Sequence, residues 1–412
     1  MSRHVGVWAA FALVHGWLAV LGVLIVPAEA FHDVELYRYW MALGLVRDQW
    51  PVLDGAWVYP AGALVPMLLP ALVTIGESYA AAWCVMVTLL DGVALAGLLR
   101  AADGSARRTA GAWWWLAFLA LLGPVAIGRL DAVVAPLLVL ALLAGARHPR
   151  TAATLLTVGA WIKLAPGAVL LPLLTAVRRP LRDVIAPAAA VCAVVVAVVA
   201  ALGGMRHLLS FLTAQQTRGL QVESVAATGW VLAARWREDV TIGLNDALVT
   251  WEVTGPGTAA TARVLDVLLA LGVGAVSALL WRARQEGRAA QALVPGAAAM
   301  LVVLIAANKV GSPQFLAWLA PPMAVALAVG LRSGHRRLPA GLLLVTAGLT
   351  QVVFPWGYER LLVGDPLVTT ALVVRNLAVV TLAVLAVIEL VRLVPRADAP
   401  VDDDVTAGTQ PA

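Results

Sequence analysis

The chain has 412 residues, of which 61% are apolar and only 13% are charged, and its formal net charge is +5. Soluble domains carry roughly 25% charged residues, so this composition excludes a soluble protein and indicates an integral membrane protein. Apolar runs of about 20 residues without strand-like alternation favour transmembrane helices over a β-barrel. The positive charge predicts no nucleic-acid partner, because the arginines mark the loops between apolar runs.

The first apolar run, residues 5–26, is followed by VPAEA, which resembles a signal cleavage site. Because the run exceeds the usual signal h-region of about 7–15 residues, we expect a retained first helix. The polar stretch AFHDVELYRYW, residues 30–40, comes next. If residues 33–40 are helical, Asp33, Tyr37 and Trp40 share one face, which suits a sugar. A solvated loop acid fits the same spacing equally well.

Other acids have less specific expectations. Glu35 is expected to make a second polar contact or to pair with Arg38, and the ion pair is favoured. Asp91 and Asp266 fall inside predicted helices, where we interpret them as buried polar contacts. Both cysteines lie within apolar runs, which predicts neither a disulfide framework nor a metal site.

The basic residues predict the topology through the positive-inside rule. Their groups, all expected to be cytoplasmic, are Arg3/His4, Arg100 to Arg108, Arg147 to Arg150, Arg178 to Arg182, Arg282 to Arg288, Arg332 to Arg337, and Arg392/Arg396. An even number of crossings must therefore separate consecutive groups. The predicted crossings, with both termini cytoplasmic, are 5–26, 79–99, 111–128, 131–147, 151–163, 165–177, 183–203, 258–281, 289–308, 315–331, 338–353 and 366–391. Residues 60–76 are not needed as a crossing, and we expect them to form a short helix in the outer leaflet. Residues 1–395 then form one polytopic transmembrane domain, and residues 396–412 follow it as a disordered cytoplasmic tail.

Four basic residues lie on the outer side of the membrane in this predicted topology, against the positive-inside bias. They are Arg129, Arg218 and the only two lysines of the chain, Lys163 and Lys309. Clustered cations at a membrane boundary suit an anionic group such as phosphate, whereas snorkelling to interface water is the alternative without function. Gln215 and Arg218 are three residues apart and are expected to share a helix face, although a purely interfacial amphipathic helix fits too.

Several outer segments together resemble the GT-C superfamily of polyprenol-phosphate-dependent glycosyltransferases. The resemblance is closest to family 87, which includes actinobacterial envelope α-mannosyltransferases that act on phosphatidylinositol mannosides and related glycolipids. The segments are DVELYRYW (33–40), YP (59–60), GRLDAVVAPLLVLALL (128–143), IKLAPGAVLLPLL (162–174), QTRGLQVES (216–224) and NKVGSPQFLAWLAPP (308–322). One departure is YPAGAL, where the family usually has two prolines after the tyrosine.

The resemblance implies an all-α integral membrane GT-C fold of about 12 transmembrane helices, with the active site just outside the plasma membrane. The first outer loop, 27–60, then carries the catalytic base, Asp33, and 204–257 forms a second periplasmic region. The implied donor phosphate-binding residues are Arg218, Lys163, Lys309 and Arg129. Candidates for sugar or acceptor binding are Glu35, Tyr37, Trp40, Asp131, Gln215, Gln221, Glu223 and Ser312.

The implied reaction is inverting transfer of a sugar, with mannose preferred, from a polyprenyl-phosphate donor to a lipid-linked glycan acceptor. Cations beside a monophosphate leaving group predict independence from metal ions and other cofactors. An arabinofuranosyltransferase of the same fold and a transporter or flippase of lipid-linked glycans remain as alternatives. Trp57, Trp356 and Tyr358 are expected to line the sugar site or to belong to the interfacial aromatic belt, and the belt is favoured.

Overall fold

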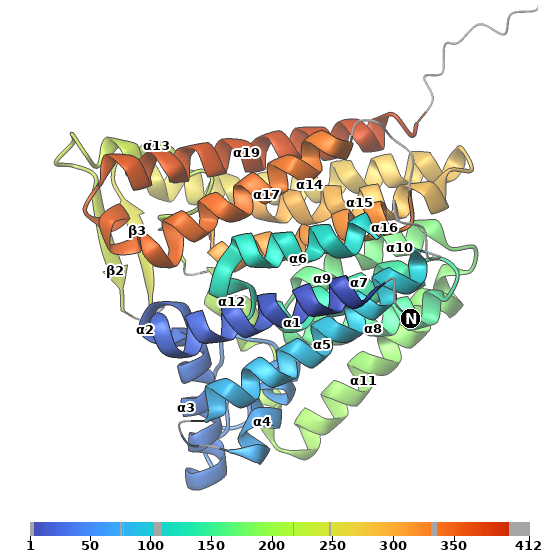
Figure 1. Cartoon of the computed structure of the whole chain (residues 1–412), viewed down its shortest axis with the longest axis horizontal. Coiled ribbons are helices and arrows are strands. Elements are labelled where there is room, and N and C mark those ends of the chain that lie inside the picture. Colours follow the sequence, from blue (N-terminus) through green and yellow to red (C-terminus); the bar gives the residue numbers. More distant parts are fainter. Residues whose placement is uncertain are drawn as a thin grey trace, which may run out of the picture.

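The computed structural model describes residues 4–74, 76, 78–102, 109–216, 218–246, 249–330 and 336–394, apart from the side chains of residues 214–216. The predicted tail, 396–412, lies outside these residues, as do Arg3, Arg107, Arg108 and Arg332 of the predicted basic groups. The chain is a multi-helix membrane protein (Figure 1).

Seven helices of the described residues are long and apolar enough to cross a membrane. They are α1 with a π-helical extension (Val5–Ile25), α5 (Tyr79–Ala101), α11 with the π-helical turn before it (Leu181–Ala201), α14 (Thr258–Gln285), α15 (Ala289–Ala306), α17 with its π-helical end (Arg337–Trp356) and α19 (Pro366–Val391). Each coincides with a predicted crossing, because an apolar run of about 20 residues matches the hydrocarbon core.

Shorter helices occupy the other five predicted crossings. They are α6 (Ala110–Leu122), α7 (Asp131–Ala144), α8 (Pro149–Ile162), α9 (Ala165–Ala168) with α10 (Leu170–Ala176), and α16 (Ala320–Ala328), which follows the 3-10 turn Pro313–Trp318. The helix α7 is apolar on all sides and lies buried against α5, α8 and α16. By contrast, only 11% of the equally apolar span Leu181–Ala201 is buried, as expected of a helix that faces lipid. The total of twelve crossings stays a prediction.

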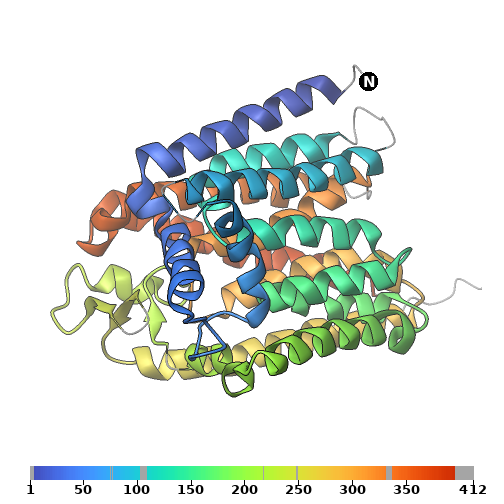
Figure 2. The same ribbon diagram turned by 90° about the horizontal axis from the view of Figure 1, so that it is seen from below.

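The remaining helices surround one end of the bundle. They are α2 (Pro27–Ala30), α3 (His32–Arg47), α4 (Leu64–Val73), α12 (Ser210–Gln216), α13 (Thr228–Ala233) and α18 (Tyr358–Leu362). The stretch predicted as a short helix, 60–76, contains α4 and the 3-10 turn Ala61–Ala63. Its position in the outer leaflet stays a prediction. Figure 2 shows α3 set across the direction of the long helices.

A small antiparallel sheet of three strands in order β1-β3-β2 interrupts the otherwise all-α fold. The strands are β1 (Leu220–Gln221), β2 (Thr241–Asn245) and β3 (Thr250–Thr254), and Val253 of β3 pairs with Leu220 and Ile242. The sequence did not predict this sheet, because strands of two and five residues show little periodicity. Figure 1 shows the sheet and α13 at one end of the bundle, opposite the end of α19.

Candidate active site

Asp33 lies in the first turn of α3, where the helix dipole favours a carboxylate. Its Oδ2 atom is 3.2 Å from Nε of Arg129, and the exposed fractions of the two side chains are 24% and 5%. Arg129 also donates hydrogen bonds from Nη1 to the carbonyl oxygens of Ala30, at 2.6 Å, and Gly128, at 3.0 Å. The buried guanidinium therefore joins the turn before α7 to the corner between α2 and α3, while the Asp33 carboxylate stays accessible.

The corner around Arg129 is closely packed. A Cβ atom at Gly128 would lie 2.8 Å from the Phe31 ring and 2.9 Å from the carbonyl oxygen of Ala30, so a side chain at this position has no room. On the other side, the backbone N–H of Leu130 donates to the Tyr37 hydroxyl at 3.3 Å. These contacts fix the position of the Arg129 side chain relative to α3.

Four aromatic rings pack beside Asp33. Ring centroids are 6.2 Å apart for Tyr37 and Trp40, 6.3 Å for Tyr37 and Tyr59, 5.4 Å for Trp40 and Trp57, and 5.5 Å for Trp57 and Tyr59. Residues 33–40 lie within α3, so Asp33, Tyr37 and Trp40 do share one helix face. The preference for an aromatic belt is wrong for Trp57, because its side chain is only 5% exposed and packs inside this cluster. Trp40 is half-buried and offers more accessible ring surface than Tyr37.

Tyr59 connects the charges of the site. Burial raises the pKa of the Tyr59 phenol well above its ordinary range, and the carboxylates of Asp33 and Asp131 raise it further, whereas Arg129 lowers it. The phenol is therefore neutral at physiological pH. The Tyr59 ring packs 6.3 Å from the ring of Tyr37 and 6.1 Å from that of Trp40, so Tyr59 lies against α3. The sequence motif YP pointed to this residue without assigning it a role.

Asp131 and Lys163 form a buried pair. Nζ of Lys163, just beyond α8, lies 2.5 Å from Oδ2 of Asp131, and Nε1 of Trp318 donates to Oδ1 at 2.6 Å. The Lys163 ammonium also lies over the rings of Phe315 and Trp318, 5.3 and 5.9 Å from their centroids. Asp131 is fully buried, so both of its oxygens have partners inside the protein. Lys163 thus has its charge compensated in this structure.

Lys309 belongs to a second junction, in which residues 308–312 pack on residues 221–224. Its Nζ lies 3.2 Å from Oδ2 of Asp266 on α14. The Asp266 side chain is 59% exposed, so the expectation of a buried contact there is wrong. The backbone N–H of Gln221 donates to the Lys309 carbonyl oxygen at 3.0 Å. The side-chain oxygen of Gln221 accepts from the Gly311 N–H at 2.8 Å. A Cβ atom at Gly311 would overlap the backbone of Ser224.

Arg218 lies between α12 and β1. The expected helix face shared with Gln215 is wrong, because α12 ends at Gln216, before it reaches Arg218. The side chain of Gln215 is outside the described part of the chain. Burial lowers the pKa of Arg218, whereas the nearby Tyr59 and Glu252 raise it. Within the described residues, the buried Nε of Arg218 has no hydrogen-bond partner, which marks an unfilled donor beside Tyr59.

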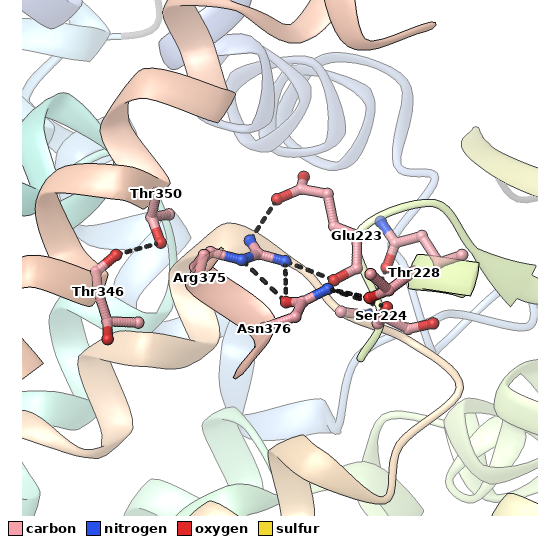
Figure 3. Close-up of polar contacts among 9 residues, drawn as sticks. Glu223, Ser224, Thr228, Thr346, Thr350, Arg375 and Asn376 are labelled. Carbon is pink, nitrogen blue, oxygen red and sulfur yellow. Dashed lines mark hydrogen bonds and ion pairs between the residues drawn. The ribbon is translucent and has the colours of Figure 1, made fainter. Parts of the chain in front are cut away.

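Glu223 forms a buried ion pair whose basic member the sequence did not reveal (Figure 3). Arg375, in the middle of α19, donates from Nη1 to Oε2 of Glu223 at 2.7 Å and from Nη2 to its carbonyl oxygen. Asn376 accepts from Arg375 and donates to the carbonyl oxygen of Ser224 and to Thr228 Oγ1. An arginine within an apolar run was the available signal, because ionisable residues in membrane segments are usually functional or paired.

The remaining predicted residues are less central. Glu35 pairs with Arg38 at 2.7 Å on the surface, so the favoured ion pair is confirmed. Ser312 lines a small cavity with Glu223 and Arg375. Asp91 is buried against Nε2 of His15 at 3.0 Å, as expected of a buried polar contact.

The described residues contain no group of three or more His, Cys, Asp or Glu side chains that could hold a metal ion. Trp356 is 49% exposed, and its place in an aromatic belt stays a prediction.

An acid, several paired cations and a group of aromatic rings thus gather at one end of the bundle of a multi-pass membrane protein. Comparison with known families gives a direct result. The sequence model of glycosyltransferase family 87 matches residues 57–307, more than half of the chain, and the protein therefore belongs to this family of glycosyltransferases. No curated protein and no solved structure matches the chain.

Proposed function

We propose that the protein transfers mannose from a polyprenyl-phosphate donor to a hydroxyl of a lipid-anchored glycan, with inversion at the anomeric carbon. Family membership supports sugar transfer. The lipid donor and mannose follow from the resemblance to actinobacterial mannosyltransferases acting on phosphatidylinositol mannosides, and arabinofuranose is the alternative sugar. The observation that carries the proposal is the accessible carboxylate of Asp33, held by Arg129 at the end of the bundle where Arg218 has a donor unfilled by any described residue.

Asp33 acts as the general base in this mechanism. Its carboxylate takes the proton of the acceptor hydroxyl while the hydroxyl oxygen bonds to the anomeric carbon. The bond from that carbon to the phosphate oxygen breaks, and its electron pair stays on the polyprenyl phosphate. Arg129 is already engaged by Asp33, so its first role is to orient the base.

Arg218 meets the negative charge that grows on the leaving phosphate. A guanidinium presents several N–H donors in one plane, and a phosphate accepts two of them at once. Because Arg218 is largely buried, its interaction with a phosphate is poorly screened by water. Lys163 and Lys309 contribute less directly, since each lies beside a carboxylate.

The site faces the outside of the plasma membrane in this proposal. The positive-inside rule supports this orientation, because α14 runs from Thr258, near the sheet, to Arg282 and Arg284. In the same way α19 runs from the Glu223 contact towards Arg392. The arginine-rich ends of both helices therefore lie away from Asp33, on the side expected to be cytoplasmic.

Reconstituted full-length protein tests the proposal with a polyprenyl-phosphate mannose donor and a lipid-linked mannoside acceptor. We expect Asp33→Asn to lower transfer by about 10²- to 10⁴-fold, the usual contribution of a general base. Glu29→Gln removes an exposed acid four residues earlier in the chain and should leave transfer unchanged. Transfer that persists in Asp33→Asn overturns the assignment of the base. Donor translocation without transfer overturns the enzymatic function, and use of arabinofuranosyl donor alone overturns mannose.

A further inference from the structure

One cavity of the described residues lies at the far end of α19 from the contact between Arg375 and Glu223. It has a volume of about 880 Å³ and lies between α15, α16, α17 and α19. Arg375 of α19 contacts the candidate site, and Arg392 at the cavity is 17 residues further along the chain (392 − 375). At about 1.5 Å per residue, this separation is about 25 Å. The cavity is thus a feature of the opposite end of the bundle.

The walls of this cavity are apolar. They include Val302, Met323, Leu343 and Leu382, which lie deep between the helices. A cavity of this character and size excludes stable filling by ordered water, which needs polar partners, and falls within the range of about 300–1,000 Å³ that holds small organic ligands. In a membrane protein the apolar material available to fill it is the hydrocarbon chain of a lipid.

The cavity opens sideways at the surface of the bundle. Leu338 and Ile388 both line it, and their side chains are 62% and 40% exposed. Its depth matches one leaflet, because Leu382 and Arg392 on α19 are ten residues apart (392 − 382), about 15 Å. Half of the hydrocarbon core of about 30 Å is the same length. A chain anchored at Arg392 would therefore end near the middle of the membrane.

The mouth of the cavity is positively charged. Arg336, Arg337 and Arg392 line it together with one acid, Glu389, which pairs with Arg336 at 3.1 Å. Within the described residues neither Arg337 nor Arg392 has an ion-pair partner. The helix α17 starts at Arg337 without a side-chain cap from the described residues, so N–H groups of its first turn add to the positive potential.

We propose that this cavity is a binding site for an anionic glycerophospholipid, with an acyl chain between α15, α16, α17 and α19 and the phosphate on Arg337 and Arg392. The apolar walls, about one leaflet deep, match an acyl chain. The excess of arginine at the mouth matches a negatively charged lipid phosphate. The carrier lipid of the glycosyl donor fits less well, because its phosphate must act at the candidate site, and the Arg375 contact with that site lies about 25 Å along α19 from Arg392.

Native mass spectrometry of the full chain in detergent tests this site by titration with phosphatidylglycerol and with phosphatidylcholine of the same acyl chains. We expect one phosphatidylglycerol to bind more tightly than the zwitterionic lipid. The double variant Arg337→Gln/Arg392→Gln should weaken its binding by about thirtyfold and leave phosphatidylcholine unchanged. Arg282→Gln, an exposed arginine on α14, is the matched control and should have no effect.

Filling the cavity tests the acyl chain separately. Ala298→Phe places a ring among the lining residues and should reduce the binding of both lipids, and Ala386→Phe serves if the first variant does not fold. Equal binding of the two lipids, or binding unaffected by the arginine changes, overturns the proposal. Displacement of phosphatidylglycerol by stoichiometric polyprenyl phosphate, with the same dependence on Arg337 and Arg392, also overturns it and assigns the cavity to the carrier lipid.

Discussion

The ion pair between Arg375 and Glu223 should contribute strongly to the stability of the candidate site. The exposed fractions of the two side chains are 5% and 1%, so Arg375→Met leaves a carboxylate buried without its partner. Removal of one member of a buried pair typically costs about 3–5 kcal/mol. Arg360→Met breaks an ion pair of the same 2.7 Å length with Asp365, but Arg360 is 59% exposed. Loss of that surface pair should cost about 0–1 kcal/mol.

Unfolding of the purified variants by titration with sodium dodecyl sulfate, followed by circular dichroism, measures this difference. The double variant Arg375→Met/Glu223→Gln should recover part of the loss, because no unpaired charge then remains buried. If Arg375→Met is no less stable than Arg360→Met, the buried pair does not hold the segment around Glu223 to α19, and the reasoning fails.

The pH dependence gives an independent check on the same pair. Burial raises the pKa of Glu223, and Arg375 opposes this effect, so the pKa in Arg375→Met should be higher still. A carboxyl group whose pKa is raised in the folded state destabilises the protein as the pH rises. The loss begins near the pKa of the group in the unfolded chain, about 4.3, and continues up to its pKa in the folded protein. The deficit of Arg375→Met should therefore be smaller at pH 5 than at pH 8. An equal deficit at both pH values would contradict the assignment of the loss to an unpaired Glu223 carboxylate.

Three further predictions concern other parts of the site. Gly311→Ala should lose about 1–3 kcal/mol of stability, because its Cβ overlaps the Ser224 backbone, whereas Gly341→Ala has open space and should not; the same detergent titration compares them. The Tyr59 phenol has a raised pKa in the folded protein, so above about pH 10 it ionises in the unfolded chain first and favours unfolding. Tyr59→Phe should therefore lose less stability between pH 9 and 11 than the wild type, and the exposed Tyr39→Phe should behave as the wild type. Transfer assayed with excess EDTA should match untreated protein, because arginine side chains meet the charge of the leaving phosphate; loss that added Mg²⁺ or Mn²⁺ restores would refute this.

The membrane helices were predictable to the extent that bilayer thickness governs their length. Spans such as Pro366–Val391 stand out in the sequence as long, predominantly apolar runs. The helix α7 has the same composition but only 14 residues, because it is covered by α5, α8 and α16 instead of lipid. Composition alone does not separate these two environments. The strands β2 and β3 were missed because five residues show little periodicity, and β1 was missed also because its pairing, Leu220 with Val253, joins segments 33 residues apart (253 − 220).

The candidate site was predictable in its residue types and less so in its pairings. The helix from His32 and the ion pair of Glu35 with Arg38 depend on local spacing, which the sequence contains. The partners of Lys163 and Lys309, in contrast, are brought near by the fold, at sequence separations of 32 and 43. Arg375 remained unrecognised because Glu223 lies 152 residues away. Long-range pairing is the part of the electrostatics that a single sequence does not contain.

These pairings change which cation is available for a phosphate. Arg129 lies against Asp33, Lys163 against Asp131 and Lys309 against Asp266, so three of the four predicted cations have a carboxylate in contact. A phosphate that approached any of these pairs would meet a negative charge as well as a positive one, and Coulomb attraction would largely cancel. Among the four, within the described residues, only Arg218 has a buried nitrogen without a hydrogen-bond partner. A leaving phosphate would fill that donor without displacing a carboxylate, and the three neutral pairs would serve to hold the ends of α3, α7 and α14 in place around it.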